Sequence, residues 1–358
     1  MVARTEVTDP VAWRAEVDGT VVRLTVADGT VFAGCGSQLH AFDAETGAEL
    51  WSADTGTPGP FRVAGGVVYA TGGGHVRAID ARTGEEHWRF RGAIPVRPAV
   101  GGGRVCVIGD SPRWGRTLHV LNARNGAEKW RMEADPKLAP PACDGDLIYV
   151  GCADGALLAL RARNGRERWR VEPDQWHPDW PERGGGIEPL GLADGTLLVA
   201  GLPYEPPPLG FVAAVDVRTG RELWQQPAGY DPGEGRPDEG DPPAALVPGG
   251  ICVAAAGSLT YLERDSGQAT RFQCTEPVRC SPPVMIGGLI CVGTSSQLIE
   301  AFDAVTGRRE WVVKDVQRPA AAGPPPLAAV HGRLVVGGHR RVYQIDPRTG
   351  ATYPSVAR

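Results

Sequence analysis

Residues 41–51 read "AFDAETGAELW": a short apolar strand, a polar turn and a second strand that ends in tryptophan. Nearly the same pattern returns as "AIDARTGEEHW" at 78–88 and as "AFDAVTGRREW" at 301–311. A polar residue followed by glycine suits a tight turn that needs positive φ, so each copy predicts a β-hairpin. A hairpin that recurs along the whole chain predicts a repeat protein.

The repeat occurs eight times in the 358 residues. When the copies are aligned on Asp43, the equivalent positions are Asp80, Asn122, Arg161, Asp216, Glu263, Asp303 and Asp346. Eight positions after the anchor, six copies have a tryptophan, whereas Arg271 and Pro354 take this place in the sixth and eighth copies. The constant spacing indicates that the hairpin and its tryptophan form one structural unit.

Each unit contains four predicted strands. Upstream of every anchor lies another apolar stretch, such as "VVYATG" at 67–72, and a glycine-bearing pair such as Gly65 and Gly66 separates it from one more. Four strands per unit, at a period of about 40 residues, is the pattern of a β-propeller. We therefore expect an all-β fold, an eight-bladed β-propeller of four-stranded blades.

The first and last units complete each other. The segment at about 9–17 carries Trp13 at nearly the spacing from the next glycine pair that the other tryptophans show, but no strands of its own unit precede it. The eighth unit, at about 318–350, is one strand short. We expect the N-terminal strand to complete this last blade, which closes the ring, removes exposed sheet edges and makes residues 1–358 a single domain.

The motif A-x-D-x-x-T-G-x-x-x-W resembles the repeat of pyrroloquinoline-quinone (PQQ) type propellers, a family that includes quinoprotein alcohol dehydrogenases and BamB-like outer-membrane assembly factors. The resemblance covers essentially the whole chain. It implies that the tryptophan of one blade docks against the glycine turn of a neighbour. The repeat tryptophans are then structural: Trp13, Trp51, Trp88, Trp130, Trp169, Trp224 and Trp311. The fold is shared by unlike functions, so it does not settle the activity.

Composition narrows the class of function. The net charge is −5, with 37 basic and 42 acidic residues intermixed, so no basic stripe predicts nucleic-acid binding. No stretch has the apolar length of a membrane span or a signal peptide, which predicts a cytoplasmic protein without membrane association. The eight cysteines include no C-x-x-C pair and no adjacent pair, so we expect buried free thiols.

The resemblance also implies what a PQQ enzyme of this family contains. Members that use PQQ are exported, bind Ca²⁺ through acidic and amide residues, and many carry a disulfide between adjacent cysteines. This chain has no export signal and no adjacent cysteine pair. We therefore expect no cofactor and no metal, and a protein that is not a quinoprotein dehydrogenase.

The long insertions are predicted to share one face of the disc. In an antiparallel blade with strands A to D, the A–B and C–D turns lie on one face and the B–C and D–A connections on the other. The C–D turns keep one length, whereas the insertions at 109–116, 171–189, 202–210, 225–244 and 318–326 all fall in B–C or D–A connections. Loops on a rigid scaffold are where binding residues concentrate, so we expect a functional mouth here, flanking the fifth blade.

Surplus aromatic residues lie in these insertions. Trp114, Trp176 and Trp180 are the tryptophans outside the repeat, and Tyr204 and Tyr230 lie nearby in the sequence. Aromatic side chains of this kind are typical of interfaces and pockets, so we treat all five as candidate ligand-binding residues. The alternative is that the tryptophans only pin the long loops onto the disc.

Two arginines are candidates for binding an anion. Arg23 and Arg97 occupy equivalent places in units 1 and 3, at the start of the innermost strand. Two guanidinium groups beside the central channel favour a carboxylate or phosphate ligand, although ordinary salt bridges are the alternative. The acidic run at 231–241 lacks the alternating ligands of a calcium loop and is interpreted as a solvated loop, with cation binding left open.

The best acid–base pair is His177 with Asp179, because a histidine beside a carboxylate titrates near neutral pH. Glu188 and Glu205 come from neighbouring segments of the fifth unit and are candidates for a second carboxylate. The alternative for all four is an ordinary solvated or structural side chain. These residues matter as catalytic candidates only if the protein is an enzyme.

The sequence favours a non-redox binding module that presents a protein partner or a small molecule to its insertion-rich face. Similar PQQ-like propellers occur as sensor or scaffold domains, for instance attached to bacterial Ser/Thr kinases. The main alternative is an enzyme, a lyase, isomerase or cyclase of specialised metabolism, whose acid–base residues line the same mouth. Whether the chain is an enzyme stays open at this stage.

Overall fold

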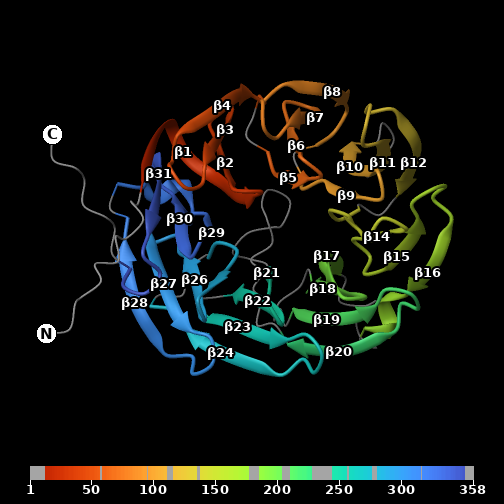
Figure 1. Ribbon diagram of the computed structural model, residues 1–358. Coiled ribbons are helices and arrows are strands. Elements are labelled where there is room, and N and C mark those ends of the chain that lie inside the picture. Colours follow the sequence, from red (N-terminus) through yellow and green to blue (C-terminus); the bar gives the residue numbers. More distant parts are fainter. Residues whose placement is uncertain are drawn as a thin grey trace, which may run out of the picture.

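The computed structural model describes residues 13–56, 59–94, 96–110, 116–134, 138–176, 185–203, 210–227, 244–255, 258–275, 280–315 and 317–350. These residues form antiparallel sheets arranged as a ring (Figure 1). The only helical segments that they include are two 3₁₀ helices, η1 (Pro173–Gln175) and η4 (Ala320–Ala322). The expected all-β fold is confirmed.

Six blades are separate four-stranded sheets, and their strands follow in sequence order from A to D. Blade 2 consists of β5 (Phe61–Ala64), β6 (Val67–Gly72), β7 (His75–Asp80) and β8 (Glu86–Arg91). Blade 3 consists of β9 (Ala99–Gly101), β10 (Arg104–Asp110), β11 (Arg116–Asn122) and β12 (Glu128–Ala134). Blade 4 consists of β13 (Ala142–Cys143), β14 (Leu147–Gly151), β15 (Leu157–Arg161) and β16 (Glu167–Val171). Blade 5 consists of β17 (Gly185–Ala193), β18 (Thr196–Pro203), β19 (Phe211–Asp216) and β20 (Glu222–Pro227). Blade 6 consists of β21 (Ala244–Val247), β22 (Gly250–Ala255), β23 (Ser258–Glu263) and β24 (Ala269–Gln273). Blade 7 consists of β25 (Val284–Ile286), β26 (Leu289–Gly293), β27 (Leu298–Asp303) and β28 (Arg309–Lys314).

Blades 8 and 1 share one strand, which closes the ring. The long strand β1 (Arg14–Ala27) pairs through its first half with β31 (His339–Ile345) and through its second half with β2 (Thr30–Cys35). The remaining strands of these blades are β29 (Leu327–Val330) and β30 (Arg333–Gly337), and β3 (Gln38–Asp43) and β4 (Glu49–Asp54). The seven strands of this sheet are thus two four-stranded blades with β1 in common, and the N-terminal strand completes the last blade as expected.

The A strands line the middle of the ring, and apolar side chains fill the gaps between blades. A strands of neighbouring blades contact each other, as β5 contacts β9 and β9 contacts β13 (Figure 1). One core cluster joins Tyr69, Val76 and Trp88 of blade 2 to Val105 and Val107 of blade 3. Because the core lies between sheets, each blade depends on both of its neighbours for burial.

The repeat tryptophans stack on glycines of the next blade, as the resemblance implied. A Cβ atom on Gly84 would lie 2.8 Å from Trp51 Cδ2, and one on Gly126 would lie 2.5 Å from Trp88 Cε3. Trp51 Nε1 also donates a hydrogen bond to the Ala81 carbonyl oxygen at 3.0 Å. The other six indoles donate to the corresponding carbonyl of the next blade, at Ala44, Ala123, Ala162, Val217, Arg264 and Pro347. Each indole thus anchors the C–D turn of its neighbour by packing and by one directed bond.

The contact between blades 6 and 7 is the exception. Arg271 replaces the tryptophan, and a Cβ atom on Gly307 would lie 3.4 Å from Phe272 Cδ1, which is ordinary contact. The register of β23 with β24 is also uninterrupted, whereas in blades 1 to 5 and in blade 7 the C–D pair shifts register beside the tryptophan, for example between Ala41 and Phe42. In these blades the bulge and the tryptophan occur together.

The anchor carboxylates fold the C–D turns. Asp43 Oδ1 accepts hydrogen bonds from the Thr46 amide and hydroxyl, each at 2.7 Å. These bonds favour the ionised form and hold the pKa of Asp43 below its usual range. The equivalent threonine bonds lower the pKa of Asp80, Asp216 and Asp303.

A buried arginine braces the closed seam. Arg318 is 1% exposed and donates through Nη1 to the carbonyl oxygens of Val21 (3.0 Å) and Gly337 (2.8 Å), on the two sides of the seam. Its Nε and Nη2 donate to carbonyl oxygens of its own segment, at Gly323, Ala322 and Pro324. Burial lowers its pKa to about 10, which leaves the guanidinium charged at neutral pH. Five carbonyl partners offset the loss of water around this buried charge.

The glycine contact can be separated from the glycine backbone conformation by two matched variants. Gly84 and Gly307 have nearly the same φ, +75° and +73°, so alanine at either position carries a similar backbone strain of about 1 kcal/mol. Gly84→Ala must also displace the Trp51 indole, which we expect to cost about 1–3 kcal/mol more than Gly307→Ala. Urea unfolding of the two variants measures the difference, and equal destabilisation would show that the indole contact does not hold the blades.

The anchor carboxylates predict how stability falls in acid. Their folded-state pKa values lie below the unfolded value of about 3.9, so the stabilisation is complete above that pH and is lost as the pH falls through the folded pKa. Blade 3 has Asn122, whose amide oxygen still accepts a bond from the Arg124 amide at 2.9 Å. A combined Asp43→Asn, Asp80→Asn, Asp216→Asn and Asp303→Asn variant should therefore fold at neutral pH. Its urea midpoint should fall less between about pH 5 and pH 2 than the midpoint of the wild type. An equal fall in both proteins would show that other groups cause the loss of stability in acid.

Candidate functional site

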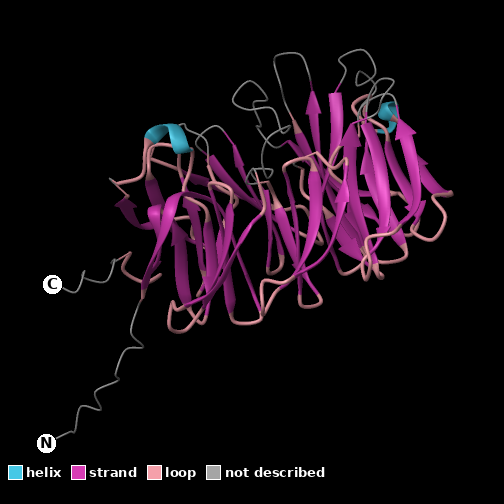
Figure 2. Cartoon of the chain, turned by 90° about the horizontal axis from the view of Figure 1, so that it is seen from above, coloured by secondary structure: helices cyan, strands magenta, loops and turns pink. Residues whose placement is uncertain are grey.

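The two faces of the ring differ in their connections. We call the face with the A–B and C–D turns the turn face, and the face with the B–C and D–A connections the loop face. Figure 2 shows the ring from the side, with η1 and η4 on one face and tight turns on the opposite one. Both 3₁₀ helices belong to D–A connections, after β16 and after β28. The loop face is therefore a single surface, and it is where chain length varies.

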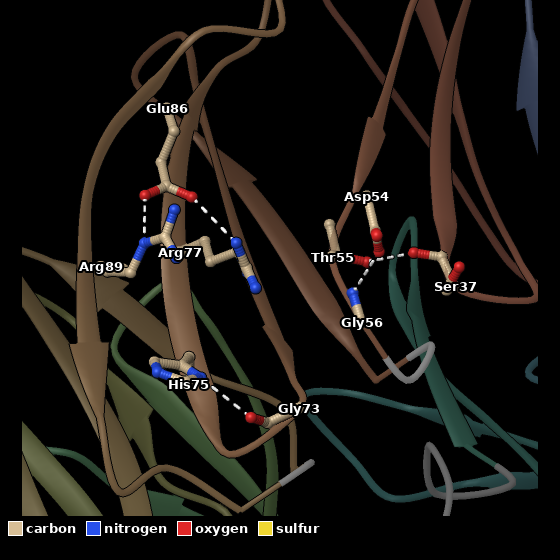
Figure 3. A network of polar contacts seen from close by, with 9 residues as sticks. All are labelled: Ser37, Asp54, Thr55, Gly56, Gly73, His75, Arg77, Glu86 and Arg89. Atoms are coloured by element: carbon tan, nitrogen blue, oxygen red, sulfur yellow. Dashed lines mark hydrogen bonds and ion pairs between the residues drawn. The ribbon is translucent and has the colours of Figure 1, made fainter.

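The variation is concentrated on blades 3 to 6. In blade 5, β18 ends at Pro203 and β19 begins at Phe211, whereas in blade 2 only Gly73 and Gly74 separate β6 from β7. The D–A connections from Val171 to Gly185 and from Pro227 to Ala244 are also long. On blades 1 and 2 the loop face is instead closed by short polar contacts, in which Thr55 donates to the Ser37 carbonyl and His75 Nδ1 lies 2.8 Å from the Gly73 carbonyl oxygen (Figure 3).

Most of the candidate side chains predicted from the sequence lie outside the described residues. They are His177, Asp179, Glu205, Trp114, Trp180, Tyr204 and Tyr230, and the acidic run at 231–241 lies there too. The segments that contain them connect strand ends on the loop face. Their roles stay predictions.

Trp176 is described, and it lies inside the fold. It is 5% exposed, its Nε1 donates to the Gly155 carbonyl oxygen at 2.8 Å, and its ring packs on Phe211 at a centroid distance of 5.6 Å. It thus ties the start of the D–A connection of blade 4 to the B–C connection of that blade and to blade 5. These contacts favour the loop-pinning alternative for this residue, and its ligand-binding role stays a prediction.

Glu188 lies on the innermost strand of blade 5. It is opposite Ala200 in the β17–β18 register and 3% exposed. The neighbouring Ile187 amide donates to the Cys152 carbonyl oxygen of blade 4 at 3.2 Å, which fixes this part of β17 against blade 4. The Glu188 carboxyl group therefore belongs to an inner strand whose backbone is fixed. Its catalytic role stays a prediction.

Arg23 and Arg97 lie near the starts of the inner strands of blades 1 and 3, as the sequence predicted, and their ligand-binding role stays a prediction. Arg23 lies on β1 opposite Gly34, and Arg97 precedes β9, so the two are separated by the whole of blade 2. The nearer partner of Arg97 is Arg62 on β5, whose pKa is lowered by burial among protein atoms and then by the positive charge of Arg97. An alignment of equivalent positions does not find Arg62, because Arg62 stands two positions nearer to the glycine pair of its unit than Arg97 does.

Two buried carboxylates also escaped the sequence analysis. Glu300 is fully buried, accepts bonds from the Thr275 amide (3.1 Å) and hydroxyl (2.8 Å), and lies 3.4 Å from Arg309 Nη1. Asp315 is similarly held by Arg341 Nη2 at 2.6 Å. A charged residue inside an otherwise apolar strand, as in "LIEAFD" at 298–303, is the signal that would have found Glu300. Both carboxylates have their partners and act as structural ties.

The described residues include no preformed metal cluster, and their thiols differ in pKa: a hydrogen bond with Cys106 lowers the pKa of Cys143. Within them, no group of three His, Cys, Asp or Glu side chains is placed to hold a metal ion. Burial raises the pKa of Cys152, Cys252 and Cys291 to about 12, so these thiols stay protonated at neutral pH. No helix in the described part of the chain has the length and apolar character to cross a membrane.

Comparison with known proteins agrees with the fold. The family model described as outer membrane protein assembly factor BamB matches residues 2–60, 35–177 and 208–354. Among solved structures, BamB from Moraxella catarrhalis is 19% identical, with a TM-score of 0.66 over 93% of this chain and 97% of that chain. No curated protein matches the chain.

Enzymes and a designed protein share the same fold. Quinohemoprotein alcohol dehydrogenase ADHIIG from Pseudomonas putida HK5 is 16% identical, with a TM-score of 0.67 over 97% of this chain and 77% of that chain. The computationally designed protein Ika8 is 15% identical, with a TM-score of 0.68 over 92% of this chain and 98% of that chain. At such identities the likeness shows the fold alone. By the family match and by the indole contacts at seven of its blade junctions, the chain belongs to the BamB-type family of PQQ-like β-propellers.

Proposed function

We propose that this protein is a non-redox binding module that holds a protein partner on the loop face around blades 3 to 6. The observation that carries the proposal is the contrast between the faces: the C–D turns repeat one conformation, whereas connections of varied length leave the loop face. A scaffold that varies on one side only is typical of proteins that bind through loops. The cytoplasmic location expected from the sequence stays a prediction.

The family supports a partner of protein nature. The matching family is described as an outer membrane protein assembly factor, and an assembly factor works by contact with other proteins. Anchors such as Trp176, with its indole bonded to blade 4, give the loop face a fixed base on which a partner can dock.

Site-specific photo-crosslinking in cells tests the proposal. Position 174 in η1 is exposed on the loop face, and position 305 in a C–D turn is 87% exposed on the turn face. With a benzophenone amino acid at one position or the other, we expect a discrete crosslinked protein from position 174 and none from position 305. Because both sites are exposed, the comparison controls for chance collisions.

Two results would count against the proposal. Equal labelling at both positions, or labelling at position 305 alone, would place the partner elsewhere. The absence of any adduct from position 174, at normal expression and with the fold intact by circular dichroism, would argue against a protein partner on this part of the face.

A further inference from the structure

Two arginines on neighbouring inner strands, Arg62 and Arg97, have no counter-charge among the residues that the structure describes. Arg62 is the second residue of β5, and Arg97 immediately precedes Pro98 and β9, so both lie at the loop-face ends of the A strands of neighbouring blades. Among the residues that the structure describes, neither guanidinium has a hydrogen bond or an ion pair with any carboxylate. Two unpaired cations at one place repel each other and attract an anion.

The backbone holds the two arginines together. The Thr71 hydroxyl, on β6 of blade 2, lies 2.8 Å from the Pro60 carbonyl oxygen and 3.1 Å from the Val96 carbonyl oxygen. Thr71 is 1% exposed, so this shared donor is shielded from water. Since Pro60 and Val96 stand just before Arg62 and Arg97, the entry points of both A strands are fixed to one side chain. The backbone segments that lead into both arginines are therefore tied to one buried hydroxyl.

The other arginines of blade 2 show what a counter-charge looks like here. Figure 3 shows Glu86 between Arg77 and Arg89, at 3.1 Å and 2.6 Å from their nitrogens. One carboxylate thus serves two guanidinium groups on the outer strands of the same blade. Arg62 and Arg97 have no comparable carboxylate partner among the residues that the structure describes.

The surroundings of Arg62 reduce the hydration of its guanidinium group. Its side chain is open to solvent and yet crowded by protein atoms, and this loss of hydration lowers its pKa, as does the nearby charge of Arg97. A guanidinium that is partly dehydrated and unpaired binds an oxyanion more strongly than one in free solution, because less water has to be displaced.

We propose that Arg62 and Arg97 form a binding site for a small multivalent oxyanion, a phosphate or a polycarboxylate, at the loop-face ends of the inner strands β5 and β9. The fork of each guanidinium matches the paired oxygens of either group, and two forks from adjacent strands match an anion with more than one charge. The anion site rests on the proposed function in one respect only: if a partner binds the loop face, an anion bound at this site lies beneath that partner. Arg23, from blade 1, is not needed for it.

Calorimetric titration of the isolated protein with pyrophosphate and with citrate, at constant ionic strength, tests the site. We expect saturable 1:1 binding of at least one of the two, and the stronger of them identifies phosphate or carboxylate as the preferred group. Arg62→Gln and Arg97→Gln should each weaken Kd by about tenfold or more, the loss expected for one charge-assisted interaction. Arg91→Gln, which removes an exposed arginine of the outer strand of the same blade, should leave Kd unchanged.

Stability without ligand gives a second readout. Because Arg62 has no described partner to lose and has a like charge nearby, Arg62→Gln should be as stable as the wild type or more stable in the absence of anion, while it loses the gain in Tm that the anion gives the wild type. No saturable binding of either probe, or binding that both arginine variants retain, would overturn the proposal. Since no protein partner takes part, either result leaves the crosslinking test of the loop face unaffected.

Discussion

The contact of an indole with a bare glycine of the next blade is the interaction on which the ring depends. It requires three things at once: a glycine without Cβ, a positive φ at that glycine, and a carbonyl placed to accept the indole N–H. Seven of the eight blade junctions meet all three conditions. The same contact recurs at each of these junctions, so neighbouring blades pack against each other in the same way.

That constraint falls on one face of the molecule only. The C–D turn carries the glycine and the anchor, so it cannot change length without losing the junction, as the shared bonds of Asp43 and Thr46 show. The B–C and D–A connections take no part in the junction. They are free to lengthen, and where one does so at the seam, Arg318 uses the added segment to brace the closed ring. The division between a constant face and a variable face is therefore a consequence of the packing.

The blades were predictable from the sequence because their determinants are local and repeat. An anchor, a turn glycine and a tryptophan at fixed spacing specify a hairpin and its neighbour contact, whatever the rest of the chain does. Even the exception at Arg271 was visible as a missing tryptophan, although the uninterrupted register beside it was not. Similar structures with at most 19% identity make the same point.

The candidate site was less predictable because its residues are neighbours in space without being equivalent in the repeat. Aligning the units pairs Arg23 with Arg97, but the ring places Arg62 of the intervening blade beside Arg97. Trp176 looked like a surplus aromatic residue and is buried against Gly155 and Phe211. Arg318 gave no signal at all, since its partners are backbone carbonyls, which every residue possesses.

The central claim is that the indole–glycine junctions hold blades 5 and 6 in the ring without the long connection between β20 and β21. The most direct measurement is the urea unfolding curve of a chain in which residues 228–243 are replaced by residues 92–98, the connection between β8 and β9. Loop length by itself changes stability by only about 0.6 kcal/mol for each doubling. We predict a single transition with a midpoint close to that of the wild type, and a chain that no longer unfolds cooperatively would contradict the claim.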